Sequence, residues 1–168
     1  LDKSVVIEFR GDEILINSEE YFSFFNTSIH IFRNIMDHGI ETKEERKEKN
    51  KNENGLILVK TEKVKDKIIL TIKDDGKGIN IDQVARKALS QGIISEDDMN
   101  GLTDEQKIDL IFSPNLSTKE QVSEISGRGI GMDIVKKNLE RLGGGVSVRT
   151  TLGKGTEFVL TIKSTNVA

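Results

Sequence analysis

Cysteine is absent from this sequence of 168 residues, and so is any long hydrophobic run. Without cysteine, disulfides and thiolate metal sites are excluded, and a reducing compartment fits the chain. No apolar stretch could span a bilayer, and no signal-peptide pattern opens the chain. We therefore expect a cytoplasmic protein with no direct membrane insertion.

Aromatic residues are scarce, at 5%, whereas charged residues make up 32% of the chain and give a net charge of −3. This acidic balance gives no general reason to bind nucleic acid. The apolar fraction of 35% is enough for a globular core, so disorder of the whole chain is excluded. The length favours a single domain over residues 1–168, and the first residue, Leu1, suggests a domain of a longer protein.

A glycine-rich stretch with Gly127, Gly129 and Gly131 runs directly into a helix predicted over Asp133–Leu142. Alternating glycines lack the Cβ atoms that would hold a ligand away from the backbone. The helix N-terminus offers unpaired N–H groups and the positive end of the helix dipole, which suits a polyphosphate. A flexible turn is the alternative interpretation of the glycines.

Short strands alternate with helices in a particular way: the helices fall between pairs of strands, not between single strands. This order predicts a mixed β-sheet with helices packed on one face, an α/β (α+β) two-layer sandwich. The expected strand pairs are Ser4–Phe9 with Glu13–Ile16, Gly55–Thr61 with Lys67–Lys73, and Gly145–Thr151 with Thr156–Ile162.

A long helix is predicted to begin at Asn17, with Glu20 completing a capping box, and to end near His38, just before Gly39. It carries two stripes at helical spacing. The apolar stripe is interpreted as core and consists of Phe22, Phe25, Ile29, Phe32 and Met36. The polar stripe is either a solvated face or a ligand-bearing one, and consists of His30, Asn34 and His38.

The stretch Glu41–Asn54 is dense in charge, so we expect a solvated connection with one helical turn over Lys43–Lys49 and no function. Asp74, Gly76 and Gly78 follow the next strand pair. The carboxylate could accept from an exocyclic amine, and the glycines would let the backbone approach a flat ring. A tight turn is the alternative.

Four signals stand in one order: Asn34 on a helix, Asp74-x-Gly76-x-Gly78, Gly127-x-Gly129-x-Gly131 and Gly153-x-Gly155-Thr156. Together they resemble the Bergerat-fold (GHKL) nucleotide-binding domain of gyrases, heat-shock chaperones, mismatch-repair ATPases and histidine kinases. More narrowly, the stretch His30–Glu41 is similar to the asparagine box of CheA-type histidine kinases. The stretches Phe112–Thr118 and Val122–Asp133 resemble their lid, expected here at about 114–131.

The resemblance implies roles for individual residues. Asn34 would coordinate the Mg²⁺ of ATP, and Asp74 would accept a hydrogen bond from the adenine amino group. Gly76 and Gly78 would lie beneath the base, and Thr156 would lie beside it. The positions implied near ribose, phosphates or lid are His38, Lys87, Ser117, Lys119, Gly127, Arg128, Gly129 and Gly131.

The resemblance also implies an activity, transfer of the γ-phosphoryl group of ATP to a histidine in two-component signal transduction. In the hydrolysing branch a glutamate base stands four residues before the asparagine, where this chain has His30. The implied partners are a histidine phosphotransfer domain, in cis or in trans, and a dimerisation domain outside this chain. The alternatives are a nucleotide-gated switch that transfers nothing and a hydrolysing ATPase.

Overall fold

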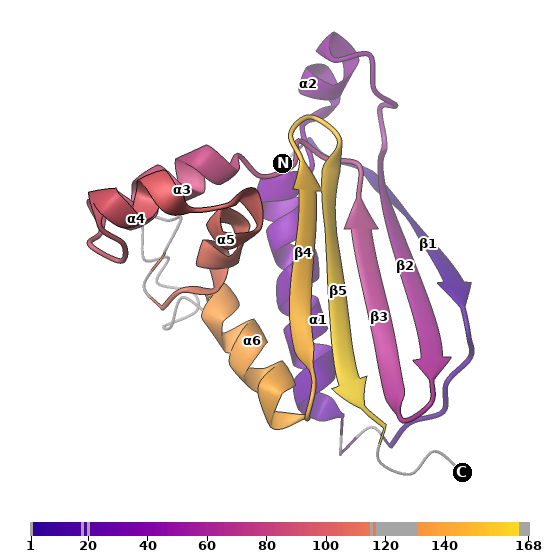
Figure 1. Ribbon diagram of the computed structural model, residues 1–168. Helices are drawn as coiled ribbons and strands as arrows, with labels where there is room; N and C mark the ends of the chain where they lie inside the picture. The colour runs from indigo at the N-terminus through magenta and orange to yellow at the C-terminus, as the bar shows by residue number, and fades with distance from the viewer. Residues whose placement is uncertain (1, 18, 20, 115, 117–130, 165–168) are drawn as a thin grey trace, which may run out of the picture. The chain divides into compact units, whose positions relative to one another are not determined.

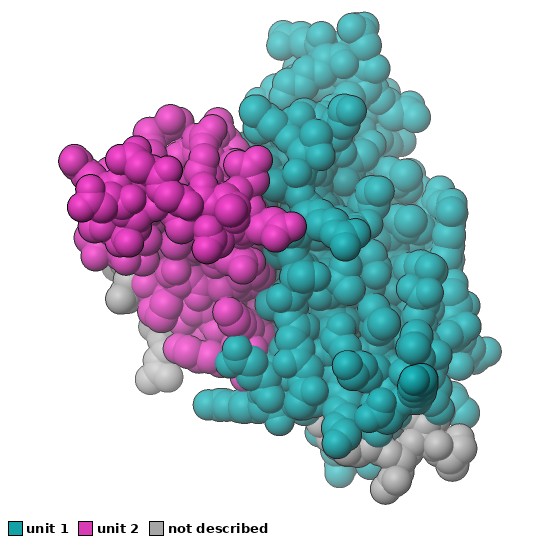
Figure 2. Space-filling model, in the orientation of Figure 1, with its two compact units in different colours: residues 1–79, 138–168 teal, residues 80–137 magenta. Residues whose placement is uncertain are grey.

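The computed structural model describes residues 2–17, 19, 21–114, 116 and 131–164. The chain divides into two compact units, coloured separately in Figure 2. Unit 1 comprises residues 1–79 and 138–168, and unit 2 comprises residues 80–137. The single catalytic domain expected over the whole chain stays a prediction.

Unit 1 is built on a five-stranded sheet with the strand order β1-β2-β3-β5-β4 (Figure 1). The strands are β1 Val5–Gly11, β2 Gly55–Val64, β3 Lys67–Asp74, β4 Gly145–Thr151 and β5 Gly155–Lys163. β1 and β2 are parallel, and every other neighbouring pair is antiparallel. The predicted mixed sheet is confirmed, as are its second and third strand pairs.

The predicted N-terminal hairpin is wrong. β1 pairs with β2 instead, and residues 13–16, all of them described, lie in no strand. Asp12 explains the difference because it is bound to β2: its backbone N–H donates to Thr61 O (2.8 Å), and its carboxylate accepts from the Lys63 N–H (2.9 Å). The Gly11-Asp12 pair therefore ends β1 against its neighbour and does not reverse the chain.

The long helix is present as α1, Phe22–Asn34, followed by a π-helical turn, Ile35–Gly39, so its predicted end at Gly39 is confirmed. It lies along one face of the unit 1 sheet (Figure 1). Its predicted start is wrong, because the side chain of Asn17 accepts from the backbone N–H of Glu19 (3.0 Å), ahead of the helix. Glu20 lies outside the described residues.

The apolar stripe predicted as core is also wrong for three of its five members: Phe22, Phe25 and Ile29 are 65%, 42% and 53% exposed. A second face of α1 is buried instead, made of Phe24, Thr27, Ser28 and Ile31. Its hydroxyl groups are satisfied within the helix, since Thr27 donates to Ser23 O (2.8 Å) and Ser28 donates to Phe24 O (3.0 Å). These bonds let small polar residues face the sheet.

Four strands contribute one buried apolar row to the core of unit 1. In register, Val59 lies opposite Ile72, Ile72 opposite Phe158, and Phe158 opposite Val148, and all four side chains are buried. Unit 1 also contains α2, Lys43–Glu48, which confirms the predicted helical turn in the charged stretch.

Unit 2 is helical over its described residues. Its helices are α3 Ile81–Ser90, α4 Glu96–Gly101, α5 Asp104–Asp109 and a 3₁₀ turn, Leu110–Phe112. Helix α6, Met132–Arg141, begins in unit 2 and ends in unit 1, and it confirms the helix predicted after the glycine-rich stretch. None of the helices in the described residues is long and apolar enough to cross a membrane.

Candidate functional site

Asp74 is the last residue of β3, opposite Ile57 of β2, and its side chain is buried. One carboxylate oxygen, Oδ1, accepts from the backbone N–H of Gly76 (2.8 Å). Among the described residues, the other oxygen, Oδ2, has no hydrogen-bond partner although it is buried. A buried acceptor without a donor is costly, so this atom marks a place where a ligand's N–H would be accommodated.

Burial raises the pKa of the Asp74 carboxyl, and the neighbouring Asp75 carboxylate raises it further. The hydrogen bond from the backbone N–H of Gly76 and the charge of Lys51 oppose this shift without cancelling it. Burial therefore disfavours the ionised form, and a donor brought by a ligand would favour it.

Gly76 lies against the end of the π-helical turn. A Cβ atom at this position would lie 2.3 Å from Gly39 O and 2.8 Å from Asp74 Oδ1, so no larger residue fits. The next residue, Lys77, donates its backbone N–H to the same Gly39 oxygen (2.9 Å). The end of the asparagine-bearing helix and the loop after β3 are therefore packed directly together.

Gly78 joins this loop to the turn between β4 and β5. It has a positive φ of 71°, and a Cβ there would lie 2.4 Å from Thr151 O. The backbone N–H of Gly153 donates to Lys77 O (2.7 Å). The two glycines predicted beneath a flat ring are thus both required by close backbone approach.

Thr156 is buried at the start of β5, and its hydroxyl lies 3.1 Å from that of Thr150 on β4. The Thr150 hydroxyl accepts from the Ile79 N–H (2.9 Å) and so ties the glycine loop to the hairpin. Sequence analysis missed Thr150, although the register of the predicted hairpin places it opposite Thr156. Unit 1 therefore gathers Asp74, Gly76, Gly78 and Thr156 around one loop.

The polar stripe continues from α1 into the π-helical turn, where the Ile40 N–H bonds to Ile35 O (2.8 Å), a five-residue step. His30 and Asn34 keep α-helical spacing and are half-buried, whereas His38 is exposed. Burial lowers the pKa of His30, and the charge of Arg33 lowers it further, so its imidazole is neutral at pH 7.

Two of the remaining predicted residues lie in unit 2. Lys87 is half-buried in the last turn of α3, and Gly131 directly precedes α6. The others lie outside the described residues: Ser117, Lys119, Gly127, Arg128 and Gly129, with nearly all of the predicted lid.

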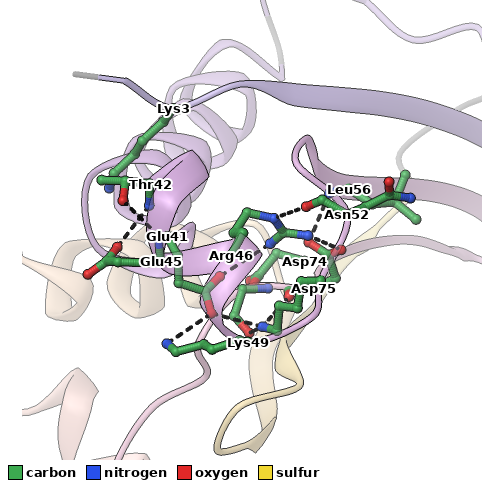
Figure 3. Close-up of polar contacts among 12 residues, drawn as sticks. Lys3, Glu41, Thr42, Glu45, Arg46, Lys49, Asn52, Leu56, Asp74 and Asp75 are labelled. Atoms are coloured by element: carbon green, nitrogen blue, oxygen red, sulfur yellow. Dashed lines mark hydrogen bonds and ion pairs between the residues drawn. The ribbon is translucent and has the colours of Figure 1, made fainter.

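The charged stretch Glu41–Asn54 is not the solvated connection that we expected. The side chains of Glu41 and Arg46 are 1% and 0% exposed, and they form a buried ion pair with Nη1–Oε2 3.2 Å (Figure 3). Arg46 also pairs with Asp75, the residue directly after Asp74 (2.7 Å). No sequence signal identified these residues, because five acidic and five basic residues alternate through the stretch.

Comparison with known proteins decides the family. The model for histidine kinase-, DNA gyrase B-, and HSP90-like ATPases matches residues 26–166. The chain belongs to this family. The predicted resemblance to Bergerat-fold domains is thereby confirmed.

Two relatives within the family are similar to this chain over nearly its whole length. The chain is 38% identical to the chemotaxis protein CheA of Bacillus subtilis over 98% of its own length and 25% of the relative's. It is 39% identical to the sensor histidine kinase CheAY of Helicobacter pylori, over 98% and 20% of the two lengths. The chain thus spans a quarter or less of these relatives.

Solved structures agree on the fold. The catalytic domain of the histidine kinase ThkA superposes with a TM-score of 0.54 at 19% identity, over 95% of this chain and 79% of that one. At this identity the likeness concerns the fold alone, and it confirms the predicted α/β sandwich.

Proposed function

We propose that this chain is the ATP-binding catalytic domain of a CheA-like histidine kinase. The observation that carries the proposal is the buried Oδ2 of Asp74, which lacks a donor among the described residues. The amino group of adenine would supply that donor, whereas guanine presents a carbonyl at the same ring position. The relatives named as CheA and CheAY support the same assignment.

The proposed roles follow the family pattern. Gly76 and Gly78 would lie beneath the base, with Thr156 beside it. The amide oxygen of Asn34 would coordinate Mg²⁺, for which an uncharged oxygen is a suitable hard ligand. Contacts to ribose, phosphates and lid are proposed for His38, Lys87, Ser117, Lys119, Gly127, Arg128, Gly129 and Gly131.

In the proposed reaction, the bond between the γ-phosphorus and its bridging oxygen breaks, a bond to an imidazole nitrogen forms, and ADP leaves. The acceptor histidine would belong to a phosphotransfer domain, in cis or in trans, and dimerisation to a further domain. Water must not take the γ-phosphoryl group in place of the acceptor histidine. His30 supports this requirement, because it stands where the hydrolysing branch has its glutamate base.

The test is incubation with radiolabelled Mg·ATP, with and without a histidine phosphotransfer domain. We expect acid-labile label on that domain, little phosphate release without it, and no label with Asn34→Ala. Because a positioned base contributes ~10²–10⁴ in rate, His30→Glu should raise hydrolysis. Rapid hydrolysis by the unmodified chain would favour an ATPase, and binding without transfer or hydrolysis would favour a switch.

A further inference from the structure

Arg46 is the most deeply buried charged residue described, and every arm of its guanidinium group is occupied (Figure 3). Nη1 donates to Glu41 Oε2 (3.2 Å) and Nη2 donates to Asp75 Oδ2 (2.7 Å). Its remaining bonds run to the backbone oxygens of Asn52 and Asn54. Arg46 therefore ties the charged stretch to the residue that follows Asp74.

Lys51 reaches the same loop from the other end of the stretch. Its ammonium donates to Glu41 Oε1 (2.9 Å), Asp75 O (2.8 Å) and Gly76 O (2.7 Å). A lysine has three donors, so this one is fully used. Two of its three acceptors are consecutive backbone carbonyls of the loop that carries the candidate adenine site.

Asp75 completes the arrangement by joining the loop to β2. Its Oδ1 accepts from the backbone N–H of Leu56 (2.9 Å), and its own N–H donates to Leu56 O (3.1 Å). We call Glu41, Arg46, Lys51 and Asp75 the Arg46 network. All four residues belong to unit 1.

A buried ion-pair network is weak evidence for stability, because removing charges from water offsets much of their attraction. What such a network does provide is fixed geometry. Lys51 holds the carbonyl of Asp75, which shares a peptide group with the Gly76 N–H that donates to Oδ1 of Asp74. The orientation of the unpaired Oδ2 therefore depends on Lys51 through one peptide unit.

We propose that the Arg46 network is a specificity-determining device: Lys51 and Arg46 position Asp74 and Gly76 so that Asp74 Oδ2 faces the six-position of a purine. Lys51 and Arg46 are positioning residues, since neither is assigned a contact with nucleotide. The inference rests on the proposed function, because it requires an adenine nucleotide at Asp74.

The test compares Lys51→Met with Lys49→Met. Both lysines pair with Glu41 Oε1, but Lys49 does so at 3.4 Å and is half exposed. Of the described residues, only Glu41 is an ion-pair partner of Lys49. Calorimetric titrations with metal-free ATP and ITP measure base selectivity, since ITP carries a carbonyl where ATP carries the amino group.

The unmodified chain should bind ATP at least about tenfold more tightly than ITP. The carbonyl of ITP and Asp74 Oδ2 are both acceptors, and neither can donate to the other. Lys51→Met should reduce this ratio to about threefold or less, mainly by weakening ATP, and Lys49→Met should leave it within about twofold. An equal loss for both nucleotides would indicate a merely structural role and overturn the inference. A ratio near one in the unmodified chain would instead overturn the proposed function.

Should Lys51→Met fail to fold, Asp75→Asn takes its place at a side chain that is 39% exposed. This variant keeps an acceptor for the Leu56 N–H but removes the charge facing Arg46. We expect a lower ATP-to-ITP ratio and faster hydrogen exchange at the Gly76 amide. A ratio and an exchange rate equal to those of the unmodified chain would overturn the inference.

Discussion

Unit 1 contains two buried carboxylates in opposite states. The side chain of Glu41 is 1% exposed, and its two oxygens accept from Arg46, Lys51 and Lys49. Asp74 is 2% exposed but accepts one backbone N–H, and its Oδ2 has no partner among the described residues. Burial raises the pKa of both carboxyls, yet in Glu41 the bonds and charges of Lys51 and Lys49 reverse the shift.

Burial alone therefore does not assign a role to a charged group. Both oxygens of Glu41 have donors, so its role is internal. Asp74 lacks a donor on one side, which is unfavourable unless a ligand provides one. Asp75 and Lys51 link the two sites. The carboxylate of Asp75 accepts from Arg46, and Lys51 donates both to Glu41 and to the backbone oxygen of Asp75.

The largest effect should come from breaking the satisfied site. Arg46→Met would leave Glu41 buried next to fewer cations, and we expect a loss of about 3–5 kcal/mol in unfolding free energy. Urea denaturation measures this. The control is Lys43→Met, whose ion pair with Glu53 is 36% and 69% exposed and should contribute about 0–1 kcal/mol. Similar losses in both variants would mean that burial of Arg46 is energetically unimportant.

The local sequence pattern indicates the Asp74 site but not the Glu41 site, for a physical reason. Asp74, Gly76 and Gly78 are adjacent in sequence, and a strand followed by spaced glycines is a local pattern. The Arg46 network joins residues as far apart as Arg46 and Asp75, 29 positions along the chain. Composition could not tell which of the five cations in Glu41–Asn54 would be buried.

Helix α1 shows the same limit in another form. Its helical spacing was predicted correctly, but the helix carries large apolar residues on two faces, and only tertiary packing selects the face that is buried. Phe22 is 65% exposed while Phe24, two positions on, is 4% exposed. The selected face includes Thr27, whose hydroxyl accepts from Asn138 of α6 (3.2 Å), a bond that no local pattern indicates.

An intermediate effect should follow from changing the unsatisfied site. Asp74→Asn keeps the shape but replaces one acceptor by an N–H donor that faces the adenine amino group. We expect ATP affinity to fall roughly 10- to 100-fold, which corresponds to about 1–3 kcal/mol. ITP, with its carbonyl, should lose less or gain. Titration calorimetry measures both, with the exposed Asp66→Asn as control.

Unlike Arg46→Met, this variant should not lose stability at pH 7, because it removes a buried charge whose pKa is raised. A melting temperature well below that of the unmodified chain would show that the Asp74 charge is already compensated in the free protein. Equal affinity of the unmodified chain and Asp74→Asn for ATP would exclude Asp74 as the reader of the base.

The smallest effect is a difference in pH dependence between the two carboxylates, since one pKa unit corresponds to only about 1.4 kcal/mol. The folded pKa of Asp74 is raised above 3.8, so the folded state favours its protonated form. The stabilisation of the folded state by the protonated form of Asp74 is complete below pH 3.8 and is lost as the pH rises through the folded pKa. The stability of Asp74→Asn relative to the unmodified chain should therefore increase between pH 4 and 7.

Glu41 should behave in the opposite way. Its folded pKa is lowered below 4.5, so its stabilising contribution is complete above pH 4.5 and is lost as the pH falls through the folded pKa. The deficit of Glu41→Gln should stay constant from pH 7 to 4.5 and shrink only below that. Urea denaturation of the three proteins across this range distinguishes the two carboxylates. Parallel curves for both variants would contradict the assignment of one satisfied and one unsatisfied site, because the two pKa values are shifted in opposite directions.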